Sequence, residues 1–213
     1  MKIAIIGAGN VGQALGIGWS RTGHSIVYGV RDPSDPKHRA AAAAGIPAKQ
    51  VAEAITDAEI IVLAVQWNAV ADVLAQCGDL SGRIVVDVTN PLAFTPEGMQ
   101  LAFGFDTSAG EKVADLAKGA KVVKTLNQVG AAVMADANRR EIPPVMFVAS
   151  DHEDAKATVT SLVRELGFDA LDGGALKTSR LLEPFAMLWI SQVYDRGAAQ
   201  DSAFAFIRPP AAA

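Results

Sequence analysis

The chain of 213 residues holds one cysteine, Cys77, and only three histidines, and each scarcity excludes a class of protein. A single cysteine rules out an intramolecular disulfide and a cysteine-based metal cluster. The histidines, His24, His38 and His152, lack the spacing of a ligand set, so we expect them on the surface or in loops and expect no metal site. Cys77 falls in a helical pattern with apolar neighbours, and we interpret it as a small buried hydrophobic residue.

An excess of charge of one sign and long apolar runs are also missing. The 19 basic and 23 acidic side chains give a formal net charge of −4, which leaves no basic surface for nucleic acid. No apolar run reaches the roughly 18 residues that a membrane helix needs. A strand is expected from residue 2, so we expect no signal peptide, no membrane partner and a cytoplasmic location.

What the chain does contain is an alternation of strand and helix patterns up to about residue 172, with 50% hydrophobic residues. Apolar runs typical of buried parallel strands lie at 2–6, 25–30, 60–65, 83–88, 121–125 and 145–149. Helices are expected after the first strand and near 36–44, 51–57, 68–77, 111–118, 130–138 and 151–166, the last with a capping box at Ser150–Glu153. This pattern predicts an α/β fold: a doubly wound, mostly parallel Rossmann-type sheet over 1–172 and a small C-terminal helical extension over 173–213.

Two segments break the alternation. Residues 91–110 lack periodicity and are rich in Gly, Pro and Phe, which predicts a loop over the active-site edge of the sheet. Apolar bulk gathers around Pro184, between Leu181 and Ile190. One interpretation is a C-terminal helix packed on the sheet. The other, compatible with the first, is that this segment closes the substrate pocket or forms a homodimer interface.

The most specific motif is Gly7-Ala8-Gly9-Asn10-Val11-Gly12, a G-x-G-x-x-G between an expected strand and an amphipathic helix. In that context the first glycine permits a tight turn, the second lets a pyrophosphate approach the backbone, and the third lets helix and strand pack closely. The helix N-terminus offers free N–H groups and a partial positive charge to the phosphates. We therefore expect a bound dinucleotide, against the alternative of a glycine-rich turn without a ligand.

The end of the second strand indicates which dinucleotide binds. NAD-binding proteins place an acidic residue about 20 residues past the glycines, on the ribose 2′-hydroxyl. Val30 stands where that acid is expected and Arg31 follows, so a 2′-phosphate would meet a cation, with further positive charge at 37–39. Alternatively, Arg31 is a solvated surface residue, or a shift of one residue makes Asp32 the ribose acid and the cofactor NAD. We favour NADP.

Further segments accompany the glycine motif, in this order: Ala64-Val65-Gln66-Trp67, Val86-Asp87-Val88-Thr89-Asn90-Pro91, Val122-Val123-Lys124-Thr125-Leu126-Asn127, Leu171-Asp172-Gly173-Gly174 and Leu176-Lys177-Thr178-Ser179-Arg180-Leu181-Leu182-Glu183. With these, the chain resembles the deazaflavin (coenzyme F420)-dependent NADP oxidoreductases as far as about residue 195. It is also similar to the cytosolic reductase domain of the STEAP metalloreductases. The D-V-T-N-P and L-x-x-S-R-L-x-E segments carry this resemblance, because many folds share the glycine motif.

The resemblance implies hydride transfer between NADP(H) and a flavin- or deazaflavin-type acceptor, with coenzyme F420, FMN or FAD as co-substrate. It places the 2′-phosphate at Val30-Arg31, where relatives often have Ser-Arg or Asn-Arg, so the valine removes a polar donor. It implies that Val65-Gln66-Trp67 and Asn90-Pro91 line the nicotinamide and its ribose, and that Asn127 meets the acceptor ring. From the residues alone, these positions are carboxyl ends of parallel strands, where open sheets bind ligands. Asn90 as a turn former and Asn127 as a helix cap remain alternatives.

The acceptor pocket is expected where these strand ends converge. Trp67, Phe94, Phe103 and Phe105 offer flat apolar surfaces that suit a tricyclic ring and exclude water. The alternative is that these aromatic side chains only pack the loop against the core.

No catalytic residue is assigned, because hydride transfer needs alignment and exclusion of water more than a protein acid or base. Lys124 and Lys177 are the lysines near the expected site, and we interpret Lys124 as a solvated or structural residue. Two other functions stay open. One is reduction of an imine, a pyrroline carboxylate or a β-hydroxyacid, and the other is a non-catalytic NADPH-binding redox sensor.

Overall fold

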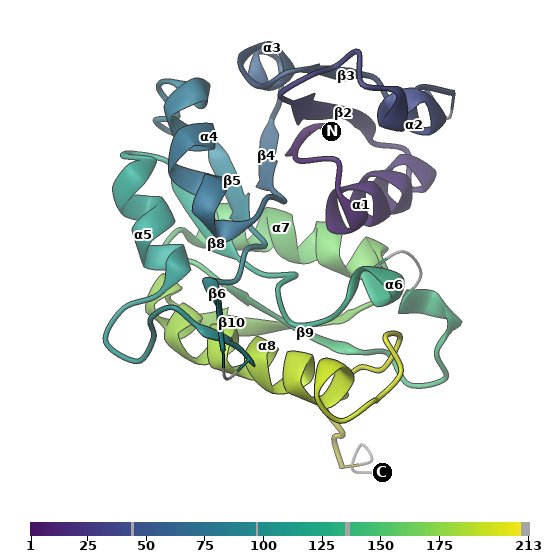
Figure 1. Cartoon of the computed structure of the whole chain (residues 1–213), viewed down its shortest axis with the longest axis vertical. Coiled ribbons are helices and arrows are strands. Elements are labelled where there is room, and N and C mark those ends of the chain that lie inside the picture. The colour runs from purple at the N-terminus through teal and green to yellow at the C-terminus, as the bar shows by residue number, and fades with distance from the viewer. Residues whose placement is uncertain (44, 97, 135–136, 210–213) are drawn as a thin grey trace.

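The computed structural model describes residues 1–43, 45–96, 98–134 and 137–209, so parts of the helices expected at 36–44 and 130–138 lie outside the described residues. One sheet has the strand order β10-β9-β8-β5-β4-β1-β2-β3 (Figure 1). Its strands are β1 Lys2–Ile6, β2 Ser25–Val30, β3 Ala48–Gln50, β4 Ile60–Leu63, β5 Ile84–Asp87, β8 Lys121–Lys124, β9 Val145–Ala149 and β10 Asp169–Gly174. Neighbouring strands run parallel except β8 and β9. The doubly wound, mostly parallel sheet is confirmed.

The path of the chain through this sheet creates a switch point. The chain moves outward from β1 through β2 to β3, then returns to β4, which pairs with the other side of β1. Ile6, at the end of β1, lies opposite Gly29 and Leu63 in the two neighbouring strands, so all three strands end at the same level. Open α/β sheets bind ligands in the crevice outside the carboxyl ends of strands at such a reversal.

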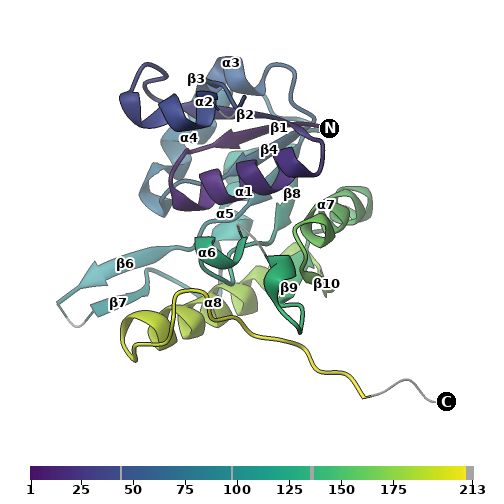
Figure 2. The same ribbon diagram turned by 90° about the vertical axis from the view of Figure 1, so that its right-hand side faces the viewer.

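Helices cover both faces of the sheet (Figures 1 and 2). One face carries α1 Asn10–Arg21, α6 Ala131–Met134 and α7 Glu153–Glu165, and the other carries α3 Val51–Ile55, α4 Val70–Cys77 and α5 Ala109–Leu116. The side chains of β1 alternate between the two cores, with Ile3 and Ile5 in the first and Ala4 and Ile6 in the second. The short helix α2 Arg39–Ala43 follows β2.

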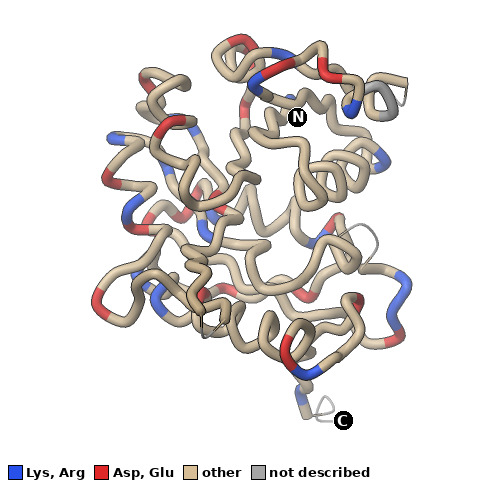
Figure 3. Tube along the Cα trace, viewed as in Figure 1, with Lys and Arg blue, Asp and Glu red and all other residues tan. Residues whose placement is uncertain are grey.

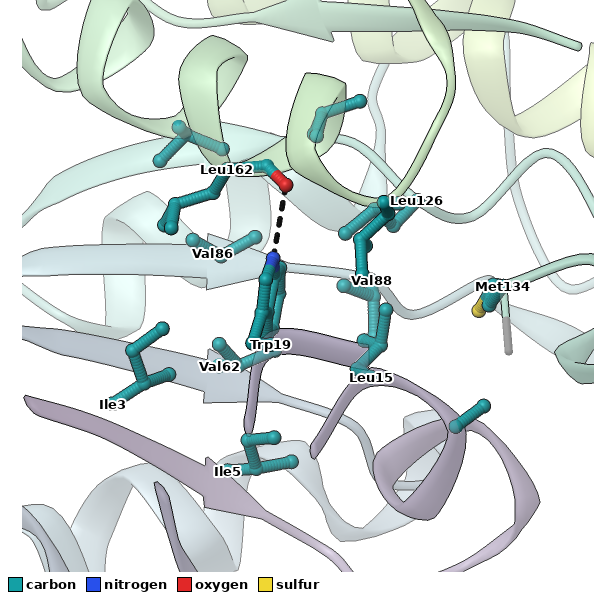
Figure 4. Close-up of a cluster of buried hydrophobic side chains, with 14 of the residues drawn as sticks. Ile3, Ile5, Leu15, Trp19, Val62, Val86, Val88, Leu126, Met134 and Leu162 are labelled. Atoms are coloured by element: carbon teal, nitrogen blue, oxygen red, sulfur yellow. Dashed lines mark hydrogen bonds between the residues drawn. The ribbon is translucent and has the colours of Figure 1, made fainter. Parts of the chain in front are cut away.

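A tryptophan ties α1 to α7 within the first core (Figure 4). Trp19 is 1% exposed, and its indole Nε1–H donates to the carbonyl oxygen of Leu162 at 2.9 Å. Because a buried indole N–H without a partner would be destabilising, this hydrogen bond lets a large side chain fill the core at little cost. In the second core, Cys77 is 8% exposed and burial raises its pKa to about 11, which confirms it as a small buried residue.

The segment 91–110 is only in part the loop that its composition predicts, because residues 102–108 alone form a stretch without helix or strand before α5. Most of the rest forms an antiparallel hairpin, β6 Leu92–Thr95 and β7 Gly98–Leu101, which projects from the sheet beside α8 (Figure 2). Leu92 and Met99 pack against the C-terminal helix. The loop prediction is wrong for the hairpin, because the apolar partner of the hairpin is the C-terminal helix, which lies far away in the sequence and leaves no local periodicity.

Two smaller predictions are also wrong. Helix α7 begins at Glu153 with His152 as its N-cap residue, so Ser150 does not cap it. The Ser150 hydroxyl instead donates to the Val122 carbonyl at 2.6 Å and accepts from the His152 N–H at 3.1 Å, because a buried neighbouring carbonyl competes for it. His38 is 5% exposed, so its side chain is buried rather than on the surface, although it ends a short turn whose other two residues are exposed.

The C-terminal segment is a continuous helix, α8 Ser179–Tyr194, with Pro184 inside it. It packs against α5 and β7, and it exposes Leu181 and Leu188 to solvent. β10 runs on to Gly174, across the expected domain boundary at 172. The division into two units and the homodimer stay predictions.

Charged residues of both signs are interspersed along the chain (Figure 3). Within the described residues, no helix is long and apolar enough to cross a membrane. The same part of the chain holds no cluster of three or more His, Cys, Asp or Glu side chains arranged to bind a metal ion.

Candidate functional site

Successive strand ends bring the predicted site residues to one edge of the sheet. The strands β2, β1, β4, β5 and β8 are neighbours in that order. Their carboxyl ends carry Arg31, the 7–12 turn, the segment 65–67, Asn90-Pro91 and Asn127. Residues that are far apart in the sequence therefore line one row, as an extended ligand requires.

The turn after β1 has the shape of a phosphate cradle. Gly7 has a φ of +107°, and a Cβ there would lie 2.4 Å from the Ala64 carbonyl oxygen. A Cβ on Gly12 would lie 1.9 Å from the Gly7 carbonyl oxygen, so α1 approaches the turn as closely as two backbones permit. A Cβ on Gly9, in contrast, would meet no atom within 4 Å. The backbone at Gly9 therefore faces open space, which is where the motif would seat a pyrophosphate.

The N-terminus of α1 directs backbone donors into that space. Gly9 is the N-cap residue, and within the described chain no side chain caps the first turn, which also lacks an acidic residue. The Gln13 side chain donates to the Ala8 carbonyl at 2.8 Å and steadies the turn. Ala8 and Val11 pack against the first core, while Asn10 is exposed. Free N–H groups and the positive end of the helix dipole favour an anion at this position.

Arg31 directly follows Val30, the last residue of β2, and is exposed. Its carbonyl accepts from Gln50 Nε2 at 3.1 Å, and among the described residues its guanidinium has no partner. One oxygen of Asp32 is engaged, because Oδ1 accepts from the backbone N–H and the hydroxyl of Ser34, at 2.9 and 2.5 Å. The hydroxyl and backbone hydrogen bonds lower the pKa of Asp32. The carboxylate thus stabilises a local turn, and the guanidinium is left for a ligand.

The basic stretch at 37–39 supplies less charge than its sequence indicates. Lys37 Nζ lies 2.7 Å from Asp35 Oδ2, which offsets its charge. His38 is buried, and neither ring nitrogen finds a hydrogen-bond partner in the described part of the chain. The Arg39 side chain lies outside the described residues.

The strand end after β4 carries an aromatic wall. Val65 packs against the second core, and Gln66 is exposed. Trp67 is half-buried and stands edge-on to Phe103, with ring centroids 5.4 Å apart and an interplanar angle of 69°. Lys112 Nζ, from α5, lies over the Phe103 ring, 4.9 Å from its centroid.

The remaining two aromatic residues predicted for the acceptor pocket are largely exposed to solvent. Phe94 of the hairpin is 78% exposed, and Phe105 is 82% exposed. Phe105 also has a φ of +60°, a conformation that costs a non-glycine residue about 1 kcal/mol or more. The structure therefore joins Trp67 and Phe103 but not all four rings.

Asn90 and Asn127 form a reciprocal pair between the ends of β5 and β8. Asn127 Nδ2 donates to Asn90 Oδ1 at 3.0 Å, and Asn90 Nδ2 donates to the Asn127 carbonyl at 2.9 Å. Asn127 Nδ2 also donates to the Leu182 carbonyl at 3.3 Å, and its Oδ1 accepts from Gln128 Nε2 at 3.2 Å. Asn127 is buried and both its amide hydrogens are used, whereas Asn90 is half-buried and keeps one hydrogen without an acceptor among the described residues. Asn90, followed by the buried Pro91, thus presents the free donor.

Beneath this amide pair lies a buried ion cluster that sequence reasoning missed. Lys124 Nζ lies 2.8 Å from Asp87 Oδ2 and 3.1 Å from Glu183 Oε1, and all three residues are 1% exposed or less. Burial alone would lower the pKa of Lys124, but the carboxylates of Asp87 and Glu183 outweigh burial and raise it. Lys124 is therefore charged and structural rather than solvated.

Glu183 joins this cluster from α8. Its oxygens accept the backbone N–H groups of Ala109 and Gly110, at 2.9 and 3.1 Å, at the N-terminus of α5. One signal for the cluster was visible in the sequence, because the charged residues Asp87 and Lys124 each end a strand directly after a pair of valines, and buried charges are paired. No local pattern pointed to Glu183 as the third member.

Comparison with known proteins identifies relatives over this whole region. A model of the family described as NADP oxidoreductase, coenzyme F420-dependent, matches residues 2–91. The chain is 28% identical over 205 residues to the F420-dependent NADP reductase of Methanocaldococcus jannaschii, which covers 89% of this chain and 91% of that protein. It is 29% identical over 182 residues to metalloreductase STEAP3 of Rattus norvegicus, covering 85% of this chain but only 36% of that longer protein.

The similarity extends to a solved structure. The crystal structure of a putative F420-dependent NADP reductase from Arthrobacter sp. FB24 has a TM-score of 0.89 and 30% identity, covering 98% of this chain and 100% of that one. The family model matches the N-terminal part of the chain, and the Arthrobacter structure aligns with the chain nearly from end to end. The chain therefore belongs to the family of coenzyme F420-dependent NADP oxidoreductases.

Proposed function

We propose that this chain transfers hydride between NADP(H) and a flavin- or deazaflavin-type ring. The observation that carries the proposal is the order of groups along the carboxyl edge of the sheet. The edge carries, in order from β2 to β5, an exposed cation at Arg31, an open turn at 7–12 that suits a phosphate and a half-buried amide at Asn90. NADP presents its 2′-phosphate, pyrophosphate and nicotinamide in the same sequence.

The residues present fit that cofactor. The open space at Gly9 and the uncapped first turn of α1 suit a pyrophosphate. The exposed Arg31 guanidinium suits a 2′-phosphate, which it can bind through two parallel hydrogen bonds. Asp32, the rival that would favour NAD, is engaged by Ser34.

When bound, NADPH supplies a hydride, and an oxidised flavin-type ring takes it up with one proton from water, so two electrons pass between them. The chain's own tasks are to hold two rings together and to exclude water. Trp67 and Phe103 offer an apolar wall beside the strand end at 65–67. The amide hydrogen that Asn90 keeps without an acceptor among the described residues would orient the nicotinamide half.

The cofactor assignment makes a prediction for Arg31. Arg31→Ala should weaken NADPH binding by roughly ten- to a hundredfold, because it removes a charge-assisted contact worth about 1.5–3 kcal/mol. NADH affinity should stay unchanged, because NADH lacks the 2′-phosphate. Isothermal titration calorimetry with both cofactors measures this. Arg21→Ala, which removes an exposed arginine from the far end of α1, is the matched control. Equal losses for both cofactors would instead favour Asp32 as the ribose acid.

The acceptor class is tested by anaerobic NADPH oxidation against coenzyme F420, FMN, FAD and a cyclic imine. We expect turnover with at least one flavin-type acceptor, because the Trp67–Phe103 wall matches a flat ring in shape and polarity. Turnover with the imine alone would identify an imine reductase. NADPH binding without any turnover would identify a redox sensor, and either outcome would refute the proposal.

A further inference from the structure

We propose that the buried ion cluster of Lys124, Asp87 and Glu183 positions Asn90 on the nicotinamide half of NADP(H), and that it couples helix α8 to this contact. The inference rests on the proposed function, because it takes the nicotinamide half to lie at Asn90. All three charged residues are 1% exposed or less, so a ligand at the surface cannot contact them directly. They are positioning residues that act through Thr89 and the amide pair.

The first step of the argument is the backbone that precedes Asn90. Both the N–H and the hydroxyl of Thr89 donate to Asp87 Oδ1, at 2.9 and 2.7 Å. The Thr89 carbonyl accepts from Lys124 Nζ at 2.6 Å. Asn90 comes next and Pro91 follows it, and a proline restricts the backbone of the residue before it. The backbone on both sides of Asn90 is thus held, on one side by the charges of the cluster.

The second step is the side chain of Asn90. Its Nδ2 donates to the Asn127 carbonyl, and its Oδ1 accepts from Asn127 Nδ2. The Asn127 side chain in turn donates to the Leu182 carbonyl and accepts from Gln128 Nε2. One hydrogen of the Asn90 amide remains, in a fixed direction. A donor that is already oriented loses little entropy when it binds, so its geometry matters more than its bare hydrogen-bond strength.

The third step is the choice of charged residues. A buried ion pair is often no more stabilising than apolar side chains of the same volume, so stability alone does not explain two carboxylates around one ammonium. An ammonium, however, can hold several acceptors in a fixed arrangement. Lys124 holds Asp87, the last residue of β5, and Thr89, in the turn that follows β5, together with Glu183 of α8. This is the arrangement needed to place a turn against a helix.

The fourth step is the double attachment of α8. Two adjacent residues of this helix support Asn90 by separate routes, Leu182 through Asn127 and Glu183 through Lys124. A displacement of α8 at this point would therefore disturb both the backbone and the side chain of Asn90. The cluster transmits the position of the C-terminal helix to the nicotinamide contact.

A double-mutant cycle between Lys124 and Asn90 tests this through binding. The readout is the affinity for NADPH compared with 2′,5′-ADP, which carries the 2′-phosphate but no nicotinamide. Lys124→Met and Asn90→Ala should each weaken NADPH binding by about five- to tenfold and leave 2′,5′-ADP binding unchanged. The double variant should lose no more than either single variant, because each change disables the same contact.

Two further variants keep the test decisive. Glu183→Gln preserves side-chain volume and leaves Lys124 paired with Asp87, so it enters the same cycle if Lys124→Met does not fold. Lys156→Met is the matched control, because Lys156 is also a buried lysine paired with two carboxylates, and in the described part of the chain it makes no hydrogen bond or ion pair with residues 87–91. It should leave both affinities unchanged.

Losses that multiply in the double variant would overturn the inference, because Lys124 would then act independently of Asn90. A parallel loss of 2′,5′-ADP affinity would also overturn it, because the cluster would then support the fold in general. The proposed function fails in a different way. NADPH binding without turnover in the wild-type chain refutes the proposed function alone, whereas absence of NADPH binding refutes both.

Discussion

Gly9→Val should weaken NADPH binding by roughly a hundredfold or more while the chain stays folded. A Cβ at Gly9 meets no atom within 4 Å, and the backbone there, with φ −77° and ψ −170°, suits a β-branched residue. The valine therefore fits the empty structure but fills the space in which the pyrophosphate would lie. Calorimetry gives the affinity, and thermal unfolding shows that the fold survives.

The matched control for Gly9→Val is Ser20→Val, which puts the same side chain on an exposed position at the other end of α1. It should leave NADPH affinity unchanged. Normal NADPH binding by Gly9→Val would show that the pyrophosphate does not bind at the 7–12 turn. Unfolding of Gly9→Val would mean that the turn is required by the fold rather than by a ligand.

Lys124→Met should lower the free energy of unfolding by about 3–5 kcal/mol, because it leaves two carboxylates buried without their cation. Asp87 and Glu183 would then face each other in a site that is closed to water. Urea unfolding measures the loss. Lys156→Met should cost only about 1 kcal/mol or less, because the carboxylates paired with Lys156 are exposed and can turn to water.

Removing one of the stranded charges should recover part of this loss. We therefore expect Lys124→Met combined with Glu183→Gln to be more stable than Lys124→Met alone, since one buried carboxylate then remains instead of two. Equal losses for Lys124→Met and Lys156→Met would show that burial of the cluster has no energetic consequence. A double variant less stable than the single one would show that Glu183 acts mainly through its hydrogen bonds to α5.

The open turn at 7–12 and the row of strand ends were predictable because local patterns encode them. A strand, three spaced glycines and a helix specify the turn at 7–12, and apolar parallel strands specify which ends share an edge. The position of Arg31 at this edge was predictable as well, because Arg31 directly follows the last residue of β2. Asp32 and Ser34 form an Asx turn, in which the Asp32 side chain accepts the backbone N–H two residues further on. The short-range sequence also favours this turn.

The partners of Asn90 and Lys124 were not predictable, because they come from distant parts of the chain. Asn127 was expected to meet the acceptor ring. In the structure its side-chain amide makes hydrogen bonds with Asn90, Leu182 and Gln128. Leu126 also adopts a left-handed φ of +57° while fully buried, a conformation that leucine seldom adopts and that only tertiary packing sustains. The hairpin at 92–101 was missed for the same reason, since its apolar face packs on α8.

The central claim is that NADPH bound along this edge gives its hydride to a flavin-type ring, and isotope transfer tests it most directly. NADPH deuterated at C4 of the nicotinamide is mixed anaerobically with the chain and oxidised coenzyme F420, and the reduced ring is analysed by mass spectrometry. We expect the reduced ring to carry deuterium, and we expect Gly9→Val to abolish the transfer. A reduced ring that carries only hydrogen from solvent, or no reduction while NADPH stays bound, would contradict the account.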